Sequence, residues 1–173
     1  MKSNIVLVGF MGCGKSTVGK LVAEHLGYVF CDTDSLIEQR ENTTVSTLFA
    51  DKGEAFFREC ERNIIRELSE QSGLVISTGG GSVMSPENAE NLRKTGFVIF
   101  LDITPKETLK RLENDTTRPL LMRKDKAVAV TELMAQRKPF YIGAAHYVLN
   151  AENNPETISK QIAELYINNR SKP

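Results

Sequence analysis

A segment near the start of the chain has the residue types and spacing of a phosphate-binding loop. Residues Gly9–Ser16 read Gly-Phe-Met-Gly-Cys-Gly-Lys-Ser, follow an apolar run and precede an amphipathic stretch. Glycines let backbone N–H groups turn toward an anion, and a helix N-terminus adds partial positive charge. Lys15 would reach the β- and γ-phosphates, and the Ser16 hydroxyl would bind Mg²⁺. A glycine-rich turn without a ligand is the alternative, but it leaves the Lys-Ser pair unexplained.

The loop predicts binding of ATP or GTP and leaves the second substrate open. A GTPase would need a base-reading motif such as Asn-Lys-x-Asp, which the sequence lacks. A kinase needs an acceptor site. Asp32 and Asp34 follow the second expected strand, and ligands of open α/β sheets bind at this edge. A helix N-cap with an exposed acid is the alternative, since a helix is expected to start near Ser35.

Three further features are ambiguous when each is taken alone. Arg58 and Glu61 lie three residues apart on an expected helix, where a solvated ion pair is the simpler interpretation. The run Gly79–Gly81 follows the third expected strand and would let a ligand approach free N–H donors, but a flexible turn is equally compatible. Arg137 ends an expected helix, where it would compensate the helix dipole.

Helices and strands must position these side chains, and the hydrophobic pattern of the sequence predicts where those helices and strands lie. Short apolar runs predict strands at Ile5–Val8, Tyr28–Cys31, Leu74–Ser77, Val98–Leu101 and Tyr147–Leu149. Amphipathic stretches predict helices containing Val18–Leu26, Phe56–Leu68 and Ile158–Tyr166, the last with Asn154 as N-cap and Pro155 at its first position. Strands that are apolar at consecutive positions are covered on both faces. The fold class is therefore α/β, with a parallel sheet between helices.

Length and composition exclude several classes of protein. A chain of 173 residues predicts one domain over residues 1–173. Lys plus Arg and Asp plus Glu both number 22, and this balance argues against binding of nucleic acid or of a membrane surface. The three cysteines have no metal-binding spacing, so zinc is disfavoured and a reducing compartment is favoured. No signal peptide or membrane-spanning run is recognised, and a cytoplasmic location is expected.

One segment has no clear periodicity. Leu112–Lys126 is polar and contains Pro119, which fits either a surface loop or a mobile lid over an active site.

Together these motifs resemble the shikimate kinase family of the aromatic amino-acid pathway. The matching segments occur in the family's order and roughly its spacing: Gly9–Lys20, Asp32–Asp34, Phe57–Glu61, Gly79–Gly81, Thr117–Leu121, and Arg137 with Pro139. The resemblance covers essentially the whole chain. It implies a three-layer α/β/α fold, a five-stranded parallel sheet in the order 2-3-1-4-5, and a mobile lid at about 112–124. It also implies a monomer that uses ATP and Mg²⁺ to phosphorylate the 3-hydroxyl of shikimate, giving shikimate 3-phosphate and ADP.

The resemblance implies roles for individual residues as well. The implied catalytic residues are Lys15, Asp34 and Arg118. The implied ATP-binding residues are Gly12, Cys13, Gly14, Lys15, Ser16, Thr17, Arg111, Arg118 and Asn154. The implied shikimate-binding residues are Asp34, Phe57, Arg58, Glu61, Gly79, Gly80, Gly81 and Arg137, with Phe49 as a second aromatic. Ser16, and Asp32 through water, would hold Mg²⁺.

The sequence allows other functions, and it departs from the family's pattern at one segment. A small-molecule kinase for another acceptor, such as gluconate, would not require two arginines in this frame. A regulatory nucleotide-binding module is less favoured because nothing needed for transfer is missing, and an ATPase motor is disfavoured because the chain leaves no coupling segment. The segment Asn150–Pro155 has no basic residue where the family often carries one, so adenine would be contacted through backbone or more weakly. The strictness of the base preference therefore stays open.

Overall fold

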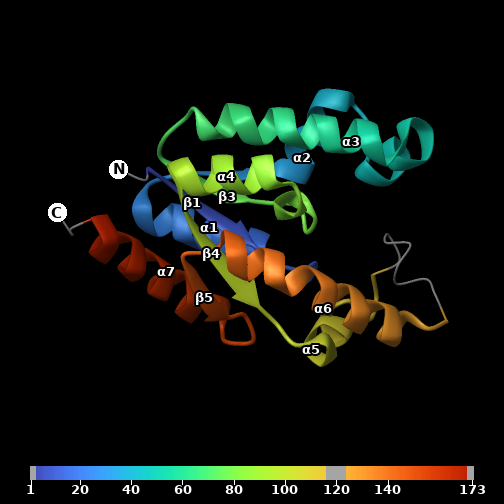
Figure 1. Cartoon of the computed structure of the whole chain (residues 1–173). Helices are drawn as coiled ribbons and strands as arrows, with labels where there is room; N and C mark the ends of the chain where they lie inside the picture. Colours follow the sequence, from blue (N-terminus) through green and yellow to red (C-terminus); the bar gives the residue numbers. More distant parts are fainter. Residues whose placement is uncertain (1–2, 116–123, 171–173) are drawn as a thin grey trace.

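A computed structural model describes residues 3–115 and 124–170 of the chain (Figure 1). Its centre is a five-stranded parallel sheet in the order β2-β3-β1-β4-β5. The strands are β1 (Asn4–Val8), β2 (Val29–Asp32), β3 (Leu74–Ser77), β4 (Gly96–Asp102) and β5 (Tyr147–Asn150). The expected sheet order is confirmed, and the five carboxyl ends meet at one edge.

Helices connect the strands as right-handed crossovers require. They are α1 (Lys15–Leu26), α2 (Thr33–Glu41), α3 (Val45–Ser69), the 3₁₀ turn η1 (Ser82–Met84), α4 (Pro86–Thr95), α5 (Pro105–Arg111), α6 (Lys126–Ala144) and α7 (Pro155–Arg170). Several begin at a side-chain cap. The hydroxyls of Thr44, Ser85 and Thr104 each accept a hydrogen bond from the N–H three residues further on, and Pro86 and Pro105 occupy first helical positions.

Helices cover both faces of the sheet, which gives three layers. Val6 and Val8 of β1 pack into one core cluster with apolar residues of α3, α4 and α6. Their neighbours Ile5 and Leu7 point the other way and pack against α1 and α7. Figure 1 shows α3 and α4 together on one side of the strands and α7 on the other. The consecutive apolar positions that predicted a doubly covered sheet are explained by this arrangement.

The helix that carries Arg137 differs from the expectation. It was expected to end there, but α6 continues through Pro139 to Ala144, so the expectation is wrong. A proline in a helix interior removes one hydrogen bond. Tyr141 and Ala144 in the following turn are buried, and their packing against β4 and its neighbours stabilises the continuation.

The expected lid falls largely outside the described residues. On one side of the undescribed part, Leu112 packs beside Gly12 of the phosphate loop. On the other side, α6 begins at Lys126. Thr117–Leu121, with Arg118, belongs to the undescribed residues 116–123. Within the described ranges, none of the helices combines the length and apolarity that crossing a membrane would require.

Candidate active site

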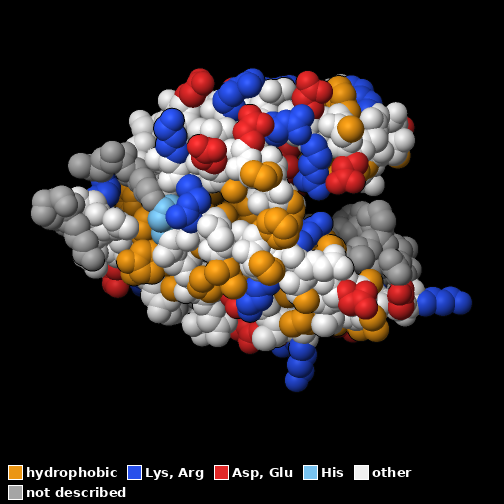
Figure 2. All heavy atoms as spheres, in the orientation of Figure 1, with side chains coloured by type: hydrophobic (Ala, Val, Ile, Leu, Met, Phe, Trp, Pro, Cys, Tyr) orange, Lys and Arg blue, Asp and Glu red, His pale blue; other side chains and the backbone are white. Residues whose placement is uncertain are grey.

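A cavity of about 740 Å³ opens at the carboxyl edge of the sheet. The phosphate loop, the β2–α2 junction and the end of β3 meet there. Its lining residues are Met11, Gly12, Gly14, Lys15, Ser16, Thr17, Asp32, Asp34, Ser35, Ser77, Thr78, Gly80, Arg111 and Pro155. Figure 2 shows a cleft on this side of the molecule, between the α3 side and the α6 side. The motifs that lie far apart in the sequence therefore line one space.

The phosphate loop has the backbone geometry that its glycines predicted. Gly12 and Gly14 have positive φ values of 75° and 94°, and Gly14 begins α1 without any side-chain cap. The backbone N–H groups in the first turn of α1 therefore have no side-chain cap and can donate to an anion. Lys15 folds over the loop, where its Nζ donates to the carbonyls of Gly9 at 2.8 Å and Phe10 at 3.0 Å. A phosphate entering the loop would offer this ammonium a stronger, charged acceptor.

Asp32 is the N-cap of α2 and also contacts Ser16. Its Oδ1 accepts hydrogen bonds from the N–H groups of Asp34 at 3.1 Å and Ser35 at 3.2 Å, so it is the N-cap of α2. Its Oδ2 accepts a hydrogen bond from Ser16 Oγ at 2.9 Å. Among the described residues no cluster of three or more His, Cys, Asp or Glu could chelate a metal. A hydroxyl and one carboxylate fit Mg²⁺, which keeps several waters and binds mainly through substrate phosphates.

The run Gly79–Gly81 is closely packed and not a flexible turn, and its middle residue, Gly80, lines the cavity. Gly79 N–H donates to the buried hydroxyl of Thr33 at 2.9 Å, which ties the run to the start of α2. A Cβ at Gly79 would lie 2.7 Å from Asp34 Oδ1, and a Cβ at Gly81 would lie 2.7 Å from Arg58 Nη2. Glycine is therefore needed for Asp34 and Arg58 to approach this backbone.

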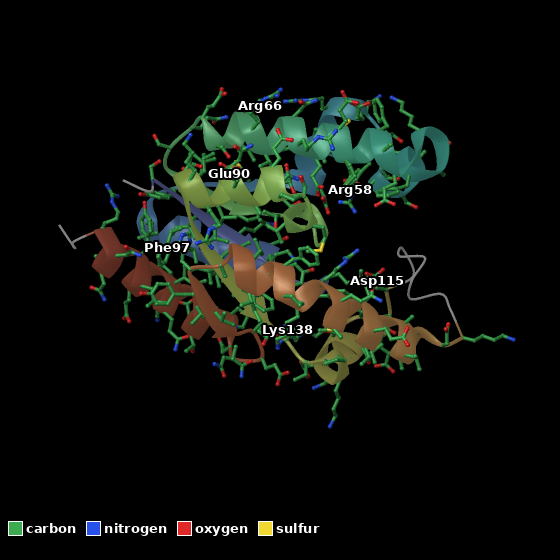
Figure 3. The ribbon with its side chains drawn as sticks, viewed as in Figure 1. Arg58, Arg66, Glu90, Phe97, Asp115 and Lys138 are labelled. Atoms are coloured by element: carbon green, nitrogen blue, oxygen red, sulfur yellow. The ribbon has the colours of Figure 1, made fainter. Side chains whose placement is uncertain are left out.

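Arg58 and Glu61 form an ion pair in which Glu61 is buried and Arg58 is half-buried, so the solvated pair favoured for them alone is wrong. Glu61 is 1% exposed; its Oε2 accepts from Arg58 Nη1 at 2.9 Å, and its Oε1 accepts from Ser82 Oγ at 2.6 Å. Burial opposes the charge of Arg58, but the carboxylates of Glu61 and Glu54 outweigh it and raise the pKa of the guanidinium. Arg58 consequently stays charged, and Figure 3 shows it projecting from α3 toward the cleft.

Arg137 approaches the same glycines from the opposite helix. Its Nη1 lies 3.4 Å from the carbonyl oxygen of Gly80, and its guanidinium lies 5.9 Å from the ring centre of Phe10. Two guanidinium groups, one on α3 and one on α6, therefore flank one short backbone segment. Planar guanidinium forks suit a carboxylate, which accepts two parallel hydrogen bonds from each fork.

The two predicted aromatics lie beside Arg58. Phe57 and Phe49 pack with ring centres 4.6 Å apart, and the Arg58 guanidinium lies 5.3 Å from the centre of the Phe57 ring. Phe57 is largely buried, so it contributes mainly an apolar wall behind the guanidinium.

Arg111 joins the phosphate loop to the segment before α7. Its Nη2 donates to the carbonyl of Ala151 at 2.9 Å, and its Nη1 lies 3.5 Å from the carbonyl of Gly12. Asn154 caps α7, since its Oδ1 accepts from Glu156 N–H at 2.9 Å, and Pro155 beside it lines the cavity. The side chain of Asn154 is thus engaged within its own helix.

Several lining residues were missed by the sequence analysis. Ser77, the last residue of β3, and Thr78 after it line the cavity, and their place directly before the glycines was a usable signal. Ser82 and Tyr141 contact the site's own residues, Glu61 and Gly80. Tyr141 lies four residues after Arg137 on one helix face, which the spacing alone could have indicated.

Comparison with known proteins narrows what the cavity does. The chain matches the family profile described as Shikimate kinase over residues 11–167. The shikimate kinase of Caldicellulosiruptor saccharolyticus is 44% identical over 169 residues, 98% of either chain. A structure of shikimate kinase from Acinetobacter baumannii in complex with shikimate matches with a TM-score of 0.93 and 35% identity, covering 99% of this chain and 97% of that one. A gluconokinase from Sinorhizobium meliloti has a TM-score of 0.58 at 15% identity over 98% of each chain, so it shares the fold alone.

Proposed function

The chain belongs to the shikimate kinase family, and from this premise we propose that it uses ATP to phosphorylate the 3-hydroxyl of shikimate through the residues of the cavity. The products are shikimate 3-phosphate and ADP, in the biosynthesis of aromatic amino acids. The observation that carries the proposal is the convergence of Arg58 and Arg137 on the glycine run. Gly80 of this run and Asp34 line the cavity of the phosphate loop, so the two guanidiniums lie next to that cavity.

The nucleotide binds with its phosphates on the loop and the first turn of α1. Gly12, Cys13, Gly14, Ser16 and Thr17 supply backbone N–H groups there, and Lys15 exchanges its two carbonyl partners for β- and γ-phosphate oxygens. Arg111 lies at the other end, bound to Ala151, and with Asn154 and Pro155 it borders the place for adenine. The absence of a basic side chain in this segment leaves the base to backbone contacts.

Mg²⁺ is the cation that this site suits. Ser16 would bind it directly and Asp32 through water, because both residues line the cavity and Ser16 Oγ donates a hydrogen bond to Asp32 Oδ2 at 2.9 Å. When bound, the ion neutralises charge on the phosphate oxygens. The carboxylate of Asp32 is oriented for this by its two backbone donors, independently of any ligand.

Shikimate binds with its carboxylate between the two arginines and its hydroxyls at Asp34. Arg58 is held in place by Glu61, and the N–H groups of Gly80 and Gly81 add donors near the guanidiniums. Asp34 accepts a hydrogen bond from the reacting hydroxyl and can take its proton. Phosphoryl transfer passes through a loose transition state, so positioning and charge stabilisation contribute more than the base. Lys15 should therefore matter more to turnover than Asp34.

The remaining expectations belong to the same proposal. Arg118, which lies outside the described residues, would reach the phosphates when a lid at about 112–124 closes and excludes water. The enzyme would act as a monomeric single domain in the cytoplasm, with no nucleic-acid or membrane partner. Figure 2 supports the last point, because the face over α3 and α4 carries side chains of both charges in alternation.

Product identification tests the proposal directly. The protein is incubated with ATP, MgCl₂ and shikimate, and the product is examined by phosphorus and proton NMR. We expect one new phosphate ester coupled to the proton on carbon 3 and stoichiometric ADP, with chelation of Mg²⁺ stopping the reaction. Lys15→Ala is the matched inactive control. Phosphate release without an ester, or an ester on another hydroxyl, would contradict the proposal.

A further inference from the structure

The carbonyl of Gly80 accepts from two side chains of α6. Tyr141 Oη donates to it at 2.5 Å, and Arg137 Nη1 lies 3.4 Å from the same oxygen. The first bond is short and the second is at the long limit for a hydrogen bond. Tyr141 is therefore the main anchor of this carbonyl, and Arg137 shares it weakly.

The Tyr141 ring is fixed in place independently of the cavity. It is 2% exposed and stacks on Phe100 of β4 with ring centres 5.1 Å apart and an angle of 28° between the planes. On its other side the ring lines a separate, mainly apolar cavity of about 580 Å³. Burial raises the pKa of Tyr141 to about 12, although Arg137 opposes this shift, so the hydroxyl remains a donor at neutral pH. A rigid ring with a permanent proton makes a fixed anchor point.

The anchored carbonyl sets the direction of the N–H group in the same peptide unit. The peptide between Gly80 and Gly81 is trans, so its N–H points away from the carbonyl, and thus away from Tyr141 and from the Arg137 nitrogen that bonds to the same oxygen. A Cβ at Gly81 would touch Arg58, so the backbone that carries this N–H lies beside the Arg58 guanidinium. The N–H groups of Gly80 and Gly81 bond to nothing else in the described part of the chain, whereas Gly79 and Ser82 both donate. They are available to an incoming anion.

We propose that Tyr141 is a positioning residue for the acceptor's carboxylate. By holding the Gly80 carbonyl toward α6, it keeps the Gly81 N–H on the opposite side of the peptide, beside Arg58, where it can donate to the carboxylate. The inference rests on the proposed function, because that function places the carboxylate there.

The sharing of one carbonyl explains why a second donor is needed. An acceptor carboxylate attracts the Arg137 guanidinium more strongly than a neutral carbonyl does. When Arg137 turns to it, the Gly80 carbonyl loses its weak partner and keeps Tyr141. Without the tyrosine hydroxyl, the peptide between Gly80 and Gly81 would be free to rotate. Its carbonyl oxygen could then face the carboxylate of the acceptor, and the two negatively polarised groups would repel each other.

Tyr141→Phe tests the inference, because it removes the hydroxyl and keeps the ring that fills the space beside Phe100. We expect the KM for shikimate to rise about threefold to tenfold, as for loss of one neutral hydrogen bond. The kcat and the KM for ATP should change less than about twofold. Tyr166→Phe is the matched control, since Tyr166 is also 2% exposed and its hydroxyl bonds to Tyr28 at 3.0 Å, on the far side of the sheet. It should lower thermal stability and leave both KM values unchanged.

A measurement without turnover separates this inference from the proposed function. In ¹⁵N-labelled protein without ligands, Tyr141→Phe should shift the Gly81 amide resonance and speed its hydrogen exchange, and Tyr166→Phe should do neither. If the wild-type protein fails to phosphorylate shikimate while these amide changes occur, the proposed function fails and the anchoring of the loop stands. Unchanged Gly81 resonances, or a Tyr141→Phe variant that loses stability like the control with no change in shikimate KM, would overturn the positioning role.

Discussion

Gly81→Ala isolates the contact between the glycine run and Arg58. Gly81 has a φ of −106°, which alanine adopts without strain, so the backbone tolerates the change. The new methyl group would lie 2.7 Å from Arg58 Nη2, 2.9 Å from Nη1 and 3.1 Å from Cζ. The head of a long side chain can move aside at little cost to folding. The substitution therefore displaces the Arg58 guanidinium, and none of the three atoms nearest to the new methyl group belongs to Arg137, Asp34 or the phosphate loop.

The size of the effect follows from this displacement. An ordinary carbon contact is about 3.5 Å, so the guanidinium must retreat by roughly 0.8 Å. A shift of that size breaks the parallel geometry of a bidentate pair and also strains the Arg58–Glu61 bond of 2.9 Å. A hydrogen bond to a charged group contributes about 1.5–3 kcal/mol, equivalent to a roughly 10- to 150-fold fall in kcat/KM. We expect that fall for shikimate and no change in the KM for ATP.

The assay couples ADP release to NADH oxidation and varies each substrate in turn, with melting temperature measured in parallel. Gly143→Ala is the control, because no atom lies within 4 Å of its added methyl group. Gly143 lies near the end of α6, so this control should gain about 0.5–1 kcal/mol of stability and keep wild-type kinetics. A Gly81→Ala enzyme with wild-type kcat/KM for shikimate would refute the placement of the carboxylate at Arg58.

Four further predictions follow from the same geometry. Lys15→Ala should abolish phosphoryl transfer in the ADP-release assay while circular dichroism shows a folded protein, and retained turnover would exclude its role. Arg137→Ala should raise the shikimate KM by at least about thirtyfold, since truncating one partner of a buried charge pair costs about 2–5 kcal/mol, with the ATP KM unchanged; an unchanged shikimate KM would argue against the clamp. Asp32→Ala should lower the unfolding free energy in urea by about 1 kcal/mol through loss of the α2 cap and raise the Mg²⁺ concentration needed for half-maximal activity; an unchanged Mg²⁺ requirement would remove Asp32 from the metal site. Burial raises the pKa of Tyr141 from 10.0 to about 12, so between those pH values the unfolded chain has lost a proton that the folded protein keeps, and the unfolding free energy should fall by up to about 1.4 kcal/mol per pH unit. Tyr141→Phe should make that alkaline fall shallower in urea titrations, and an identical slope would contradict the buried hydroxyl.

Local patterns predicted those parts of the molecule that depend on neighbouring residues. The phosphate loop is such a part, because its glycines, its lysine and the start of α1 are consecutive and their geometry is local. The parallel sheet expected from the apolar runs is confirmed, as are the family assignment from the motifs and the strand order that the family resemblance implied. The strand ends shifted by only a few residues, since apolar runs define a strand's centre better than its ends.

Contacts between distant segments were beyond local reasoning. The spacing of Arg58 and Glu61 indicated an ion pair, but it could not show that Glu61 is buried with Ser82, which donates to Glu61 from another element. Likewise, Pro139 argues locally for a helix end, and only the packing of Tyr141 against Phe100 explains why α6 continues. The short helices α4 and α5 were not identified, because neither has a long amphipathic repeat.

Acceptor selectivity tests the central claim most directly. Initial rates of Mg²⁺-dependent ADP release are compared for shikimate, gluconate, nucleoside monophosphates and no acceptor, at equal concentrations of ATP. The arrangement of Lys15, Asp34, Arg58 and Arg137 predicts the highest kcat/KM for shikimate and rates near the acceptor-free background for the others. Equal or faster ADP release with gluconate or a nucleoside monophosphate, or none above background with shikimate, would contradict it.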